Sequence, residues 1–243
     1  MKILVCISHV PDTTSRINFV DNNTKFDTTG VQYIIGPYDD YALARAIELK
    51  ESQAATVTVI NVGLAETEPT LRKGLAIGAD DAIRVNADPT DSFFVATQIA
   101  EYAKGYDLIL MGRESIDFNG GVVHSLTGEL LGMPSFSPVM KLEIEGTKVK
   151  MVREIEGGKE VLEASLPLVA GCQEPIAEWK IPNMRGIMSA RTKPLKVVDP
   201  KSVEPPTKIV RFELPAPKGA VKMIPADQVG DLVNLLKTEA KVL

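Results

Sequence analysis

The sequence contains few cysteines and no long uninterrupted hydrophobic segment. Only Cys6 and Cys172 occur among its 243 residues, each within an apolar run, so we expect two buried thiols rather than a disulfide framework. No apolar run approaches the roughly 20 residues that a membrane-spanning helix needs. The first residues, MKILVCISHV, lack the pattern of a secretory signal. We therefore expect a cytoplasmic protein without membrane insertion.

Positive charge is also scarce. Lys and Arg together number 27 against 32 Asp and Glu, which gives a formal net charge of -5. Such a balance provides no general attraction for a nucleic-acid backbone or for an anionic membrane surface. We do not expect nucleic acid as a partner.

Several motifs of enzymes are missing. The first apolar run is not followed by G-x-G-x-x-G, and the chain has no G-x-x-x-x-G-K-[ST] loop and no G-x-S-x-G turn. The two histidines, His9 and His124, are not paired at the spacing of metal ligands, and we interpret them as loop or helix-face residues. The sequence therefore predicts no metal site and no catalytic residue.

Short apolar runs alternate with helix-like segments in the first half of the chain. Runs rich in Val and Ile without polar alternation are typical of strands buried on both faces of a parallel sheet. The intervening segments carry apolar residues at three- and four-residue spacing, as crossover helices do. The pattern predicts an α/β fold with an open, mostly parallel, twisted sheet and flanking helices, which is Rossmann-like. The predicted strands are Ile3–Ile7, Thr56–Val62, Ala82–Val85 and Leu108–Met111, and the predicted helices are Asp39–Glu51, Glu66–Ile77 and Ser92–Lys104.

The pattern changes after Met111. A loop rich in Gly, Ser, Asn and Asp, Gly112–Gly121, precedes a helical segment, Val122–Leu131. Turn residues then separate short strands with alternating faces, which predicts an added antiparallel hairpin series. These strands are Val139–Ile144, Lys148–Ile155 and Val161–Ala164, and an apolar strand follows at Leu166–Cys172.

The C-terminal part of the sequence is rich in proline. From about Pro175 onward prolines recur, the chain becomes basic at Arg185–Lys196, and a last amphipathic helix is predicted at Asp227–Lys237. Such a tail cannot form a core by itself. We divide the chain into an α/β domain, residues 1–190, and an extended C-terminal arm, residues 191–243, that packs on a partner.

The loop Gly112–Gly121 is the main candidate for a binding site. It lies between the carboxyl end of a predicted parallel strand and the start of a helix, where ligands of open α/β sheets bind and where helix N-terminal amides attract phosphate. Gly120 and Gly121 allow the backbone to approach an anion closely, although a merely flexible loop explains the pattern equally well. Three further strand ends, Cys6–Asp12, Gly36–Asp39 and Asn61–Leu64, face the same crevice, which favours nucleotide binding.

Several longer motifs match a known family. The segments Val152–Glu160 (VREIEGGKE), followed by Leu166-Pro167, and Ile187–Lys193 (IMSARTK) resemble the signature of electron transfer flavoprotein beta subunits. The loop beginning GRESID at Gly112 and the segment Ala76–Asp80 (AIGAD) also look like that family. The similarity extends from Lys2 to about Lys196.

The resemblance implies an electron carrier without substrate chemistry of its own. Members of the family form a heterodimer with an alpha subunit that carries a redox-active FAD, and the beta subunit holds AMP, or a second FAD in some members. The pair transfers electrons from acyl-CoA or other dehydrogenases to a quinone-linked or other acceptor. By position, the nucleotide contacts implied are Cys6, Gly36, Pro37, Tyr38, Asp39, Val62, Gly112, Arg113, Glu114, Ser115, Ile116, Asp117, Phe118, Asn119, Gly120, Gly121, Val122 and Val123.

The chain departs from the family pattern at two places. Gly36 stands where the family often has Asn, and Val122–Ser125 replaces a stretch of the Thr-Gly-Gln type at the helix start. We therefore expect the backbone amides of Asn119–Val123 to contribute more of the phosphate binding.

The resemblance also implies contacts with partner proteins. A docking loop for the partner enzyme maps to Ile181–Met188, with Met184 as an apolar anchor beside Arg185 and Ile187; a core-filling role for Met184 is the alternative. Tyr38 falls where the family places an aromatic near the alpha-subunit flavin; ordinary capping of the helix that begins at Asp39 is the alternative.

Two other classes of protein share the predicted architecture. A nucleotide-binding stress or signalling protein would also use strand-end loops and glycine-assisted phosphate contacts, but it does not account for the hairpin series or the arm. An adenylating or pyrophosphatase enzyme would carry a Ser-Gly-Gly loop after the first strand, where this sequence has Ser8–Asp12, SHVPD.

Overall fold

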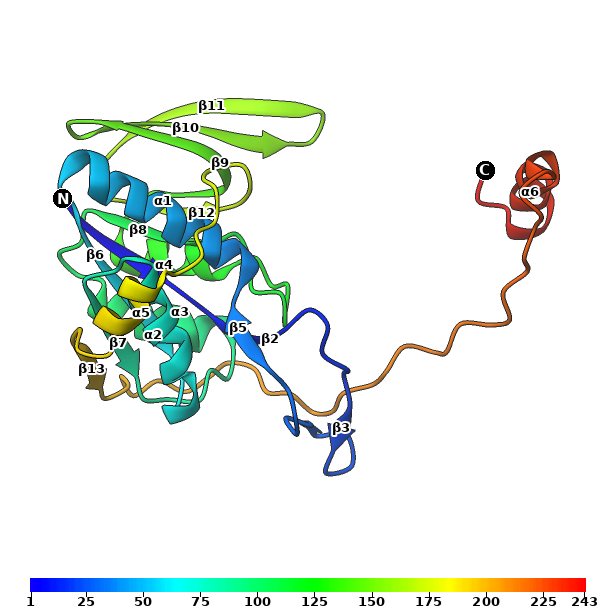
Figure 1. Cartoon of the computed structure of the whole chain (residues 1–243), viewed down its shortest axis with the longest axis horizontal. Coiled ribbons are helices and arrows are strands. Elements are labelled where there is room, and N and C mark those ends of the chain that lie inside the picture. The colour runs from blue at the N-terminus through cyan, green and yellow to red at the C-terminus, as the bar shows by residue number, and fades with distance from the viewer.

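A nine-stranded sheet forms the centre of the structure, a computed structural model that describes residues 1–243 (Figure 1). The strand order is β11-β10-β9-β12-β8-β1-β6-β7-β13, and all neighbours are parallel except the pairs β9–β10 and β10–β11. The predicted open, mostly parallel sheet is confirmed. Its strands are β1 (Lys2–Cys6), β6 (Thr56–Val62), β7 (Asp81–Val85), β8 (Leu108–Gly112), β9 (Ser135–Glu145), β10 (Lys148–Ile155), β11 (Gly158–Ser165), β12 (Leu168–Cys172) and β13 (Leu195–Val198).

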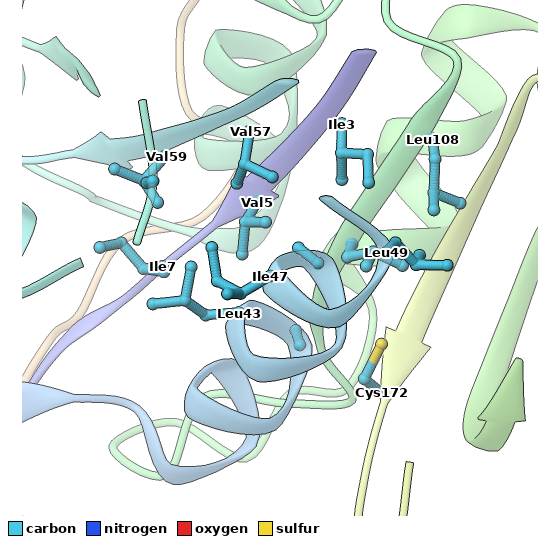
Figure 2. Close-up of a cluster of buried hydrophobic side chains, with 14 of the residues drawn as sticks. Ile3, Val5, Ile7, Leu43, Ile47, Leu49, Val57, Val59, Leu108 and Cys172 are labelled. Atoms are coloured by element: carbon cyan, nitrogen blue, oxygen red, sulfur yellow. The ribbon is translucent and has the colours of Figure 1, made fainter. Parts of the chain in front are cut away.

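Four helices cover the parallel part of the sheet. On one face, Leu43 and Ile47 of α1 belong to the same core cluster as Val5 of β1 and Val59 of β6, as Figure 2 shows. On the other face, Ile99 of α3 packs in a second cluster with residues of β1 and β8. Each buried aliphatic side chain of this kind contributes roughly 1.5–3 kcal/mol, and because helices cover both faces, these strands are predominantly apolar. The helices are α1 (Pro37–Gln53), α2 (Glu68–Ile77, preceded by a 3-10 turn at Ala65–Thr67), α3 (Ser92–Tyr102) and α4 (Val123–Leu131).

The hairpin series extends the same sheet. Strand β9 pairs in parallel with β12, and β10 and β11 follow as antiparallel neighbours. The β10–β11 turn places Gly157 at φ +81, and the β9–β10 turn places Gly146 at φ +63, a conformation that glycine adopts without strain. The predicted antiparallel series is confirmed, and Figure 1 shows it at the edge of the molecule beyond α1.

Helix α5 (Met184–Ala190) is the first of several regular elements that the sequence analysis did not predict. It replaces most of the predicted loop Ile181–Met188, so the loop conformation is wrong there. The side chain of Asn183 accepts the Gly186 N–H (2.8 Å) and caps this helix, and Gly186 contacts the Ala76 carbonyl of α2. Pro182 and Gly186 indicate a loop when read locally, whereas packing against α2 stabilises a short helix.

Strand β13, at the edge of the nine-stranded sheet, was also not predicted. It pairs in parallel with β7, with Leu195 opposite Ala82. The sheet therefore continues to Val198, within the range 191–243 that the sequence analysis assigned to the arm. Four residues after a proline are too few to show a strand pattern, and the pairing depends on β7, which is more than a hundred residues away in the sequence. Two short antiparallel pairs were also missed: β2 (His9–Pro11) with β5 (Tyr33–Ile35), and β3 (Phe19–Val20) with β4 (Lys25–Phe26).

The rest of the C-terminal part is an extended arm. It runs along the body from Asp199 to about Phe212 and then leaves it, and Figure 1 shows its last helix far from the sheet. This helix, α6 (Val229–Leu235), continues as one π-helical turn at Leu236–Ala240, and neither contains a buried residue. The predicted helix at Asp227–Lys237 is confirmed in position. No helix of the chain combines the length and the apolar character that crossing a membrane requires.

Candidate functional site

A large cavity opens at the carboxyl ends of β1, β6 and β8. Its volume is about 1220 Å³, and its walls include Ser8, Gly63 and Gly112 at the ends of these three strands. This is the edge of an open α/β sheet at which ligands bind. All four strand-end loops predicted from the sequence contribute residues to the cavity wall. Hydrogen bonds to Asp39 connect three of these loops.

Most of the residues predicted as nucleotide contacts line this cavity. The others belong to the same two loops, Gly36–Asp39 and Gly112–Val123, but do not line the cavity themselves. The predicted residues that line the cavity are Cys6, Asp39, Val62, Gly112, Arg113, Glu114, Ser115, Asp117, Phe118, Gly120, Gly121, Val122 and Val123. Those that do not are Gly36, Pro37, Tyr38, Ile116 and Asn119.

Asp39 joins three of the strand-end loops. The backbone N–H and the hydroxyl of Ser8 donate to Asp39 Oδ2 (2.8 and 2.5 Å), and the backbone N–H of Gly112 donates to Oδ1 (2.7 Å). Asp39 lies in the first turn of α1, where the helix dipole also favours a negative charge. Burial nevertheless raises the pKa of Asp39 to about 6, because desolvation outweighs the hydrogen bonds from Ser8 and Gly112.

Two glycines allow these loops to approach Asp39. A Cβ on Gly112 would lie 2.7 Å from Asp39 Oδ1 and 2.7 Å from Tyr38 Cβ. A Cβ on Gly36 would lie 2.6 Å from Asp39 Oδ2 and would also contact the Ser8 hydroxyl. A side chain at position 36 would therefore displace the Ser8–Asp39 contact, which gives a physical reason for glycine there.

The glycine-rich loop leads directly into the start of α4. Asn119 and Gly121 adopt positive φ angles (+49 and +61), and the Asn119 N–H donates to the Ser115 carbonyl (2.7 Å). Helix α4 begins after Val122 without a side-chain cap. The first N–H groups of a helix have no partner within the helix, and Val122 and Val123 line the cavity. The cavity wall thus contains a helix N-terminus suited to an anion.

Two residues that the sequence analysis interpreted as ordinary histidines also line the cavity. His9 stacks on Tyr33 with ring centroids 4.2 Å apart, and its Nδ1 lies 2.7 Å from Thr70 Oγ1. Burial lowers the pKa of His9, although Glu66 opposes this shift. His124 lies in the first turn of α4, and burial lowers its pKa against the influence of nearby backbone carbonyls. The place of His9 in the strand-end loop Cys6–Asp12 could have indicated that it lines the cavity. No feature of the sequence indicated that Tyr33 also lines it.

Tyr38 lies outside the cavity, beside Arg113. The Arg113 guanidinium carbon is 4.7 Å from the centroid of the Tyr38 ring. Arg113 also donates to Glu114 (2.9 Å) and to Gln173 (3.1 Å). Tyr38 makes no side-chain cap for α1, whose N-cap residue is Gly36.

The predicted docking residues form a separate exposed surface on α5. Met184 is 73% exposed and Ile187 is 40% exposed, and Arg185 is also exposed. None of the three lines the cavity. The exposure of Met184 excludes a core-filling role.

The sheet, its flanking helices and the cavity at its carboxyl edge define an α/β protein of the Rossmann-like class. The family model of the electron transfer flavoprotein domain matches residues 23–203. An electron transfer flavoprotein subunit beta of Bacillus subtilis is 36% identical over the full length of both chains. One of Syntrophomonas wolfei is 36% identical over 90% of this chain and 88% of the relative, and one of Homo sapiens is 28% identical over 100% and 99%. The chain belongs to the electron transfer flavoprotein beta subunit family.

Proposed function

We propose that the chain is the nucleotide-binding subunit of an electron-carrying heterodimer. Its partner is an alpha subunit with a redox-active FAD, and the pair accepts electrons from an acyl-CoA or other dehydrogenase and passes them to a quinone-linked or other acceptor. The chain contributes no substrate chemistry and works in the cytoplasm. Membership of the beta-subunit family supports this assignment, and the cavity at the strand ends is the observation that carries it.

The cavity fits an adenine nucleotide, which is either AMP or the adenine part of a second FAD. Its volume of about 1220 Å³ exceeds what a mononucleotide fills, and the start of α4 offers backbone amides to a phosphate. The backbone of Asn119–Val123 would hold the phosphate, while Val62 and Gly63 would form the part of the wall beside the sugar or base. When bound, the flavin of the alpha subunit supplies the redox chemistry. The residues of this chain bind and orient the nucleotide and exclude water.

Counting released nucleotides tests this proposal directly. We expect the chain expressed alone to be colourless, and the chain co-expressed with its alpha subunit to purify as a yellow heterodimer. After denaturation, chromatography and mass spectrometry should give one FAD from the alpha subunit and one further adenine nucleotide per heterodimer. A yellow, redox-active monomer, or a heterodimer without the second nucleotide, would contradict the assignment.

Helix α5 is proposed as the docking surface for the partner enzyme. Exposed Met184 lies at the first turn, with Ile187 and Met188 (67% exposed) within the same short helix. The Asn183 cap and the packing of Gly186 on α2 fix this helix. A small apolar surface on a rigid element suits a transient redox contact, in which little area is buried.

Replacing Met184 by Ala tests the docking role. We expect electron transfer with the physiological partner to slow several-fold through weaker association, because a central apolar anchor typically contributes about 1–2 kcal/mol. Transfer to a small artificial dye, the nucleotide content and subunit assembly should be unchanged. Met223→Ala is the matched control, because Met223 is 82% exposed and lies on the arm. If Met184→Ala slows transfer to the partner enzyme and to the dye equally, or slows neither, the docking surface lies elsewhere.

A further inference from the structure

The first part of the C-terminal arm is fastened to α3. The buried side-chain amide of Gln98 donates to the Lys201 carbonyl (2.9 Å) and accepts the Lys201 N–H (2.7 Å). Tyr102 donates its hydroxyl to the Asp199 carbonyl. Both contacts lie on α3, whose first residues line the cavity, so the arm reaches the cavity in a fixed position.

Two further contacts hold the arm across the cavity. The backbone N–H and the hydroxyl of Thr207 both donate to Asp91 Oδ2 (3.0 and 2.9 Å), while Asp91 Oδ1 caps α3 by accepting the Phe94 N–H (2.8 Å). Phe212 stacks on Phe19, with ring centroids 4.8 Å apart. The segment Pro206–Ile209, which contains Thr207 and precedes Phe212, forms part of the cavity wall, and we call it the strap.

The strap lies at the end of the cavity where the glycine-rich loop meets α3. A Cβ on Gly120 would be 3.4 Å from Ser92 Oγ, so the loop that precedes α4 adjoins the start of α3. Ser92 follows Asp91, to which Thr207 is bonded. The strap is therefore close to the helix N-terminus that offers amides to a phosphate.

The charges of the cavity wall single out one residue of the strap. The wall contains six carboxylates, Asp39, Glu66, Asp88, Asp91, Glu114 and Asp117, but its only Lys or Arg residues are Arg113 and Lys208. Arg113 is engaged by Glu114, Gln173 and Tyr38. Lys208 takes part in none of the ion pairs of the structure. A phosphate in so acidic a cavity needs a cation that is free to pair with it.

We propose that the strap closes the phosphate end of the cavity and that Lys208 pairs with the phosphate of the bound adenine nucleotide. This inference rests on the proposed function, because it names a specificity-determining residue for the same site. The Asp91–Thr207 contact positions the strap, and Lys208 distinguishes a phosphorylated ligand from a nucleoside. The arm thereby completes the cavity, in addition to any contact with a partner subunit.

The test compares AMP with adenosine on the full-length chain co-expressed with its alpha subunit. Labelled AMP is loaded, and its release into excess unlabelled AMP is followed. We expect Lys208→Ala to release AMP about tenfold faster, which corresponds to about 1.4 kcal/mol, while affinity for adenosine changes by less than about twofold. Thr207→Val should speed the release of both ligands, because it loosens the strap without removing the cation. Lys218→Ala is the matched control, since Lys218 lies on the arm outside the cavity wall.

The outcomes separate this inference from the proposed function. If the unaltered protein binds neither AMP nor adenosine, the nucleotide site itself is wrong. If the unaltered protein binds AMP and Lys208→Ala releases it at the same rate, nucleotide binding stands and the role of Lys208 is overturned. Equal weakening of AMP and adenosine by Lys208→Ala would also overturn it, because a packing role does not depend on the phosphate.

Discussion

Replacing Gly112 by Ala is expected to lower the free energy of unfolding by about 3 kcal/mol and to abolish the nucleotide binding proposed for the cavity. The new Cβ would lie 2.7 Å from Asp39 Oδ1 and 3.0 Å from the Asp39 backbone nitrogen. Neither atom can move freely, because the Asp39 carboxylate accepts a hydrogen bond from Ser8 and the Asp39 backbone belongs to α1. The substitution combines overpacking with the weakening of a buried hydrogen bond to a charged group. Both effects fall on the loops that form the cavity wall.

Urea unfolding and nucleotide content measure this effect. Gly158→Ala is the matched control, because Gly158 has open space around its Cβ position and no positive φ. It should change the free energy of unfolding by less than about 0.5 kcal/mol. If Gly112→Ala unfolds like the unaltered protein and retains its nucleotide, the close approach of β8 to Asp39 is not part of the site.

Replacing Asp39 by Asn is expected to change how stability depends on pH. Burial raises the folded-state pKa of Asp39 to about 6, above its ordinary value of 3.8. The folded protein therefore binds this proton more tightly than the unfolded chain, and the stability that the neutral carboxyl contributes is lost as the pH rises through 6. Between pH 4.5 and pH 8 this loss amounts to about 2 kcal/mol in the unaltered protein, and the Asp39→Asn variant does not share it.

The difference between variant and unaltered protein isolates this group from other carboxylates. At pH 4.5 we expect Asp39→Asn to be less stable by about 1–3 kcal/mol, because its amide N–H₂ faces the Ser8 N–H and leaves that donor unpaired. At pH 8 the difference in the free energy of unfolding between the two proteins should be smaller by about 2 kcal/mol. Urea unfolding at both pH values gives the two differences, and Asp88→Asn at an exposed position of the cavity rim is the control. A gap that is constant or that widens with pH would contradict the raised pKa.

The two substitutions probe different properties of the same group of contacts. Gly112→Ala tests whether the loops pack closely around Asp39, and Asp39→Asn tests whether the carboxyl is desolvated there. Together they distinguish a cavity held by a buried acid from one that is open to solvent. The proposal for Lys208 depends on neither, because the strap is held through α3.

The sequence alone determined the central architecture. Apolar runs such as Thr56–Val62 specify strands buried on both faces, and Pro69 and Gly78 mark the start and the end of α2. These are local signals, since each depends on a few neighbouring residues. Motifs such as VREIEGGKE at Val152–Glu160 and GRESID at Gly112 placed the chain in its family before any contact was known. The loop Gly112–Val123 was likewise predicted as a binding site from local sequence, because its motif and its glycines are contiguous in the chain.

Only the tertiary structure decided how distant segments come together. The Gly112–Asp39 bond joins residues 73 apart in the sequence, and the Asp91–Thr207 bond joins residues 116 apart. No local pattern specifies such pairs, because each residue has an ordinary local explanation: Asp39 as an acid at a helix start, and Thr207 as a polar residue of a proline-rich segment. Helix α5 and β13 likewise form because α2 and β7 are there to receive them. Packing between remote segments thus turned a predicted crevice into a cavity whose wall contains both the buried Asp39 and Lys208.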